Sequence, residues 1–122
     1  MKRPGTLITK NKVEQKETVQ QLSSLREATR CIERDLDRVR RTQLEIEVDL
    51  KNISQPTGPV TVHQIGNNYF YKKRKHQMLS AVIKERQKLE TLHRHHMDRL
   101  NSLKKALAQT TKTIGHLTDK YT

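Results

Sequence analysis

The sequence lacks tryptophan, and its 122 residues include only four aromatic residues and one cysteine. Hydrophobic residues make up 32% of the chain and charged residues 31%, which leaves too few large apolar side chains for the core of a globular domain. The sequence holds no run of eighteen apolar residues, so it predicts no membrane-spanning helix. The lone Cys31 excludes an internal disulfide. These absences favour long amphipathic helices that bury a narrow apolar stripe.

Acidic residues are also scarce, because 25 Lys and Arg stand against 13 Asp and Glu, giving a net charge of +12. The excess is uneven. Residues 1–12 carry four basic residues and no acid, residues 13–53 are nearly neutral, and residues 67–122 carry thirteen basic and four acidic residues. Such asymmetry indicates an acidic partner: nucleic acid, an anionic membrane surface or an acidic protein polymer.

The first half of the chain repeats apolar residues at alternating spacings of three and four. This 3.5-residue period keeps one stripe of a helix against a partner helix, so it predicts a coiled-coil helix over residues 13–53 that follows a basic N-terminal arm, residues 1–12. The predicted seam, eight of whose ten members are aliphatic, consists of Leu22, Leu25, Thr29, Ile32, Leu36, Val39, Gln43, Ile46, Leu50 and Ile53.

A second helix is predicted over residues 68–121, after an elbow loop at residues 54–67. Pro56, Gly58 and Pro59 break the first helix, and Val60, Val62 and Ile65 alternate like a short extended piece. The second seam has the same spacing and consists of Leu79, Val82, Arg86, Leu89, His93, His96, Leu100, Leu103, Leu107, Thr110, Ile114, Leu117 and Tyr121.

The fold class that follows is all-α: two long helices joined by a Pro/Gly elbow in an antiparallel coiled-coil hairpin, an extended rod rather than a globule. Folding near residue 60 places the acidic cluster at residues 45–49 beside the basic residues 72–75, and the one at residues 33–37 beside Lys84, Arg86 and Lys88. The alternative is that both helices run straight on and pair with other chains. Either way, two helices bury so little surface that we expect a further partner, another coiled-coil protein or a second copy.

No motif supports catalysis or a cofactor. The segment LHRHHMDRL places His93 and His96 on the seam and His95 away from it, so the three imidazoles do not converge on one metal ion. Glycine-rich phosphate loops and nucleophile elbows are also missing from the sequence. The chain is therefore predicted to be neither an enzyme nor a metal protein.

Two surfaces are candidates for partner binding. The segment YFYKKRKH places aromatic rings beside cations that can stack on bases or bind a protein surface, and its members are Tyr69, Phe70, Tyr71, Lys72, Lys73, Arg74 and Lys75. Alternatively, the aromatic rings pack the elbow and the lysines face the acidic cluster opposite. A ladder on the first helix could bind anions or simply be solvated, and it consists of Arg26, Arg30, Arg34, Arg38 and Arg41.

The segment LREATRCIERDLDRVRRTQLEIEVDLKN, residues 25–52, resembles the Arg- and Leu-spaced helices of tektins and related coiled-coil proteins of ciliary microtubules. The resemblance implies a structural or adaptor protein of the cytoskeleton, an axonemal or microtubule inner protein that docks on tubulin's acidic surface. The alternatives are a nuclear nucleic-acid-binding protein and a subunit of a cytoplasmic tether or motor-adaptor complex.

Overall fold

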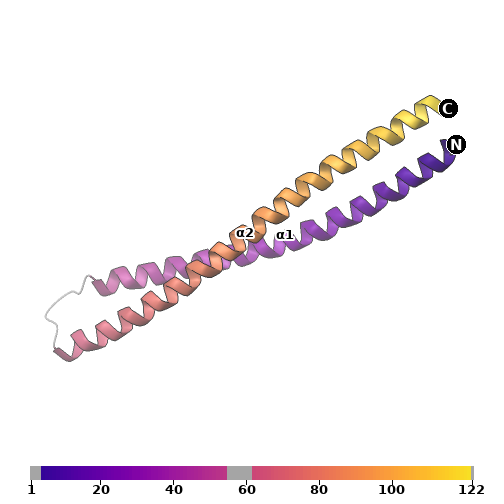
Figure 1. Cartoon of the computed structure of the whole chain (residues 1–122). Helices are drawn as coiled ribbons and strands as arrows, with labels where there is room; N and C mark the ends of the chain where they lie inside the picture. The colour runs from indigo at the N-terminus through magenta and orange to yellow at the C-terminus, as the bar shows by residue number, and fades with distance from the viewer. Residues whose placement is uncertain (1–3, 55–61, 122) are drawn as a thin grey trace. The chain divides into compact units, whose positions relative to one another are not determined.

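The computed structural model describes residues 4–54 and 62–121, all of which are helical. Helix α1 spans Pro4–Ser54 and helix α2 spans Val62–Tyr121 (Figure 1). This confirms the all-α helical hairpin. Neither helix, over the described residues, has a stretch apolar enough to cross a membrane.

The hairpin divides into two compact units, each of which pairs one segment of α1 with one segment of α2. Over the described residues, unit 1 comprises residues 4–31 and 93–121, and unit 2 comprises residues 32–54 and 62–92. In both units the two helical segments run side by side in opposite directions (Figure 1).

In unit 2 the apolar core comes mainly from α1. Its buried side chains are Ile32, Leu36, Val39, Ile46 and Leu50. The α2 seam residues that face them are only half-buried, namely Leu79, Val82, Arg86 and Leu89. Three polar contacts cross between the helices: Lys75 to Asp49, Arg86 to Gln43 and Glu90 to Arg40. Residue numbers rise along α2 in this series and fall along α1, so the two helices pair in antiparallel fashion.

Unit 1 has a smaller apolar core. Leu22 and Thr29 of α1 and Leu100 of α2 are buried, and the Thr29 hydroxyl donates to the Leu25 carbonyl at 2.7 Å. The remaining described seam residues of this unit are half-buried, namely Leu25, His93, His96, Leu103, Leu107, Thr110, Ile114 and Leu117.

Helix α1 begins at Pro4, so the prediction that residues 1–12 form an arm separate from the helix was wrong over the described part. Proline suits a first helical turn, where its missing N–H has no intrahelical acceptor in any case. The 3–4 stripe also continues toward the N-terminus through half-buried Ile8, Asn11, Gln15 and Thr18. Since three of these four residues are polar, an apolar pattern does not reveal them.

Helix α2 begins at Val62, so the predicted elbow loop was wrong for residues 62–67; residues 55–61, with both of its prolines, lie outside the described residues. Val62 and Ile65 are three positions apart, which is a helical spacing as well as one compatible with a loop. A glycine inside a helix costs only about 1 kcal/mol relative to alanine, so Gly66 does not end α2.

The charge-based register is correct at one end of unit 2 and displaced at the other. Lys75 contacts Asp49, as the pairing of the two clusters requires. Arg86, however, bonds to Gln43, which lies six residues beyond Asp37 on α1. The physical reason is that a guanidinium within the seam needs a seam acceptor, whereas exposed ion pairs contribute only about 0–1 kcal/mol each.

Candidate partner-binding surface

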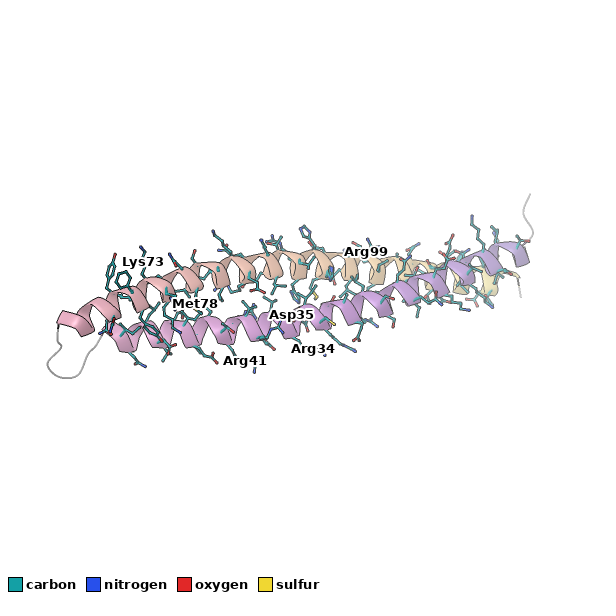
Figure 2. All side chains as sticks on the ribbon, turned by 90° about the horizontal axis from the view of Figure 1, so that it is seen from below. Arg34, Asp35, Arg41, Lys73, Met78 and Arg99 are labelled. Atoms are coloured by element: carbon teal, nitrogen blue, oxygen red, sulfur yellow. The ribbon has the colours of Figure 1, made fainter. Side chains whose placement is uncertain are left out.

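The residues Tyr69 to Lys75, here called the aromatic–basic patch, lie near the start of α2 in unit 2. Tyr69 is 63% exposed and Phe70 is 69% exposed, and their rings meet edge to face with centroids 5.6 Å apart. Lys72, Lys73 and Arg74 are exposed as well, and Lys73 points away from α1 (Figure 2). Two large aromatic side chains in water beside three cations form an unusual surface for a helix.

One member of the patch, Lys75, contacts α1 instead. Lys75 Nζ donates to Asp49 Oδ2 at 3.0 Å, and the Lys75 side chain is only 17% exposed. The same Nζ lies 5.3 Å from the centroid of the Tyr71 ring, within cation–π range. The hydrogen bond to Asp49 raises the pKa of Lys75, and a hydrogen bond to Tyr71 adds to that effect. Lys75 and Tyr71 therefore fix the base of the patch.

Three arginines of the ladder have partners on their own helix. Arg30, in unit 1, lies 3.6 Å from Glu27, and Arg38, in unit 2, lies 3.0 Å from Asp35. Arg41 Nε donates to the Asp37 carbonyl at 3.3 Å. Figure 2 shows Arg34 and Arg41 pointing away from α2. The contacts of Arg30, Arg38 and Arg41 are those of a solvated helix surface, and anion binding by the ladder stays a prediction.

A layer of polar side chains crosses the seam of unit 2. The sequence analysis did not predict that these side chains contact one another. Arg86 Nη1 donates to Gln43 Oε1 at 2.7 Å, and Gln43 Nε2 donates to Glu47 Oε1 at 2.9 Å. Arg86 Nε lies 3.3 Å from Glu90 Oε1, close enough for charge attraction although not aligned for a hydrogen bond. Glu90 also lies 3.6 Å from Arg40. The signal was present in the sequence, because Gln43 and Arg86 are polar members of the two predicted seams.

The three histidines of the segment LHRHHMDRL differ in burial. His93 and His96 are half-buried in unit 1, and His95 is exposed. Among the described residues no group of three metal-ligating side chains lies close enough to hold an ion. The Nδ1 atom of His96 is buried and has no hydrogen-bond partner, which makes it an unsatisfied polar atom in the unit 1 core.

Comparison of this chain with protein-family models, with curated proteins and with solved structures finds no match.

Proposed function

We propose that the protein is a non-enzymatic structural adaptor whose aromatic–basic patch docks on an acidic surface of a protein polymer. The exposure of Tyr69 and Phe70 beside Lys72, Lys73 and Arg74 carries this proposal. Aromatic and arginine side chains contribute most strongly to protein interfaces, and a basic surround speeds encounter with an acidic partner.

The polymer that we propose is the microtubule, in a cytoskeletal setting such as the ciliary axoneme. Tubulin's acidic surface complements a chain with a net charge of +12, and the tektin-like spacing of residues 25–52 supports the same setting. The contacts of Lys75 with Asp49 and Tyr71 hold the base of the patch in place. The other cations of the patch stay free to contact a partner.

The test is co-sedimentation of the full chain with taxol-stabilised microtubules. The patch variant K72E/K73E/R74E should bind at least about tenfold more weakly than the wild type, since three attractive charges become repulsive. The matched control K104E/K105E/K112E reverses three exposed charges in unit 1 and should retain most of the binding. Equal losses in the two variants would show that net charge alone, and not the patch, drives binding.

A Y69S/F70S variant tests the aromatic half of the patch at unchanged charge. Removal of tubulin's acidic tails by limited proteolysis should weaken wild-type binding and leave the K72E/K73E/R74E variant little affected. Failure of the wild type to co-sediment would refute the microtubule as the partner. Tight binding to duplex nucleic acid that falls steeply with salt would then favour the nucleic-acid alternative, and binding to neither polymer would favour the tether.

A further inference from the structure

Three apolar side chains of α2 in unit 2 are exposed and form a stripe along the helix. Tyr71 is 47% exposed, and Met78 and Leu92 are each 44% exposed. Spacings of seven and fourteen residues place all three on one face of the helix, with Glu85 at the remaining heptad position. Met78 lies beside the line where α1 and α2 meet (Figure 2). We call Tyr71, Met78 and Leu92 the α2 stripe. The α2 stripe therefore flanks the seam.

The charges around the α2 stripe are mainly positive. Arg74 and Lys88 are exposed and form no ion pair within residues 4–54 and 62–121. By helical periodicity, both lie on the side of the stripe that faces away from the seam. Two acidic residues of α1 in unit 2 are paired, Asp49 with Lys75 and Asp35 with Arg38. Arg74 and Lys88 give the outer edge of the stripe a positive charge.

From this combination we infer that the α2 stripe is the docking face for an amphipathic helix of another protein, one with an apolar stripe flanked by glutamates or aspartates. A helix laid beside a two-helix seam buries its apolar residues against exposed ones, and its acidic flank meets Arg74 and Lys88. The docking face shares Tyr71 and Arg74 with the aromatic–basic patch, whereas Met78, Lys88 and Leu92 lie outside that patch. The protein would thus bridge two partners.

A second copy of the chain fits this face poorly. Two α2 stripes brought together would place Arg74 and Lys88 of one copy near the same cations of the other, with only Glu85 to offset them. Like charges across an interface disfavour association. The charge pattern therefore selects an acidic helix over a copy of α2.

The experiment uses a fluorescein-labelled synthetic helix about three heptads long, with leucines on one stripe and glutamates on both flanks. Its binding to the full chain is measured by fluorescence anisotropy. The wild type should bind this peptide and should not bind a matched peptide with lysine flanks. The M78S/L92S variant should bind about tenfold more weakly, because it loses the apolar contacts.

The matched control is V13S/V19S, which removes two apolar side chains of similar exposure, 51% and 49%, from unit 1. It should bind the peptide as the wild type does. The R74E/K88E variant tests the charge rim without touching the apolar stripe, and it should also weaken binding. Circular dichroism verifies that each variant is helical.

Three results would overturn the inference: equal affinity of the M78S/L92S variant and the wild type, equal binding of the lysine-flanked peptide, or a wild-type dimer in analytical ultracentrifugation that M78S/L92S dissociates. The last result would make a second copy the occupant of the face. Microtubule co-sedimentation of M78S/L92S should equal that of the wild type, so the failure of this inference and that of the proposed polymer contact are distinguishable.

Discussion

Replacing Gln43 should reveal how far the polar layer of unit 2 stabilises the hairpin. Arg86 donates to Gln43 at 2.7 Å from a side chain that is 27% exposed, and hydrogen bonds to charged groups contribute about 1.5–3 kcal/mol when buried. Allowing for the partial exposure, we take about 2 kcal/mol as the coupling between the two side chains.

The Q43L variant gains about 1 kcal/mol from apolar burial and loses that coupling, so it should be about 1 kcal/mol less stable than the wild type. In an R86M background the guanidinium is absent, and the same Q43L change should instead stabilise the hairpin by about 1 kcal/mol. The double variant should match or exceed the wild type, because apolar residues of similar volume often replace a buried charge without loss.

The assay is urea unfolding of the wild type, Q43L, R86M and Q43L/R86M, followed by circular dichroism and combined as a double-mutant cycle. A cycle in which Q43L changes the free energy of unfolding equally in both backgrounds would refute the reasoning. A second readout tests register, since a polar seam pair fixes it. With C31S as background, a short bis-maleimide should link the D49C/K75C pair within the chain, and should do so less completely once Q43L/R86M is added.

Three further changes test the structure elsewhere. The pKa of Lys75 is raised, so its contribution to stability is complete below the unfolded-state pKa of about 10.4 and is lost as the pH rises through the higher folded-state pKa. The urea midpoint of the wild type should therefore fall more steeply than that of K75M in alkali above about pH 10.4, and parallel curves would contradict this. The H96L variant removes the unsatisfied Nδ1 atom from the unit 1 core and should stabilise the protein by about 1–2 kcal/mol, seen as a higher melting temperature; a lower one would show that the imidazole is needed. The G115A variant adds a Cβ with nothing within 4 Å, inside α2, and should stabilise by about 1 kcal/mol; no gain would mean that the helix does not persist at this position.

The sequence sufficed for the helical hairpin because the aliphatic residues of its first half repeat so regularly. The half-buried run at Asn11, Gln15 and Thr18 continues the same 3–4 spacing with polar side chains, so an apolar pattern does not reveal it. One of these residues, Gln15, donates across the hairpin to Thr111 at 3.1 Å. An apolar pattern predicts the end of a helix poorly when the seam positions near that end hold polar residues.

The pairing of particular residues was harder to predict than the fold. Surface charge placed Lys75 correctly beside Asp49 but did not place Arg86 beside Gln43. Each exposed pair contributes too little to select one register among several, whereas a guanidinium inside the seam strongly requires an acceptor. The polar members of the two seams were the better guide, and matching them to each other would have given the observed contact.

The uneven burial of the two helices has a consequence for how this protein tolerates change. In the described part of the chain the buried apolar side chains come from α1, with Leu100 of α2 as the exception. Substitutions along α1 should therefore be selected against for loss of the folded state, while many positions of α2 can vary at little structural cost. In a deep mutational scan, substitutions in α1 should reduce the amount of folded protein more often than substitutions in α2. New binding specificities should therefore arise more readily on α2.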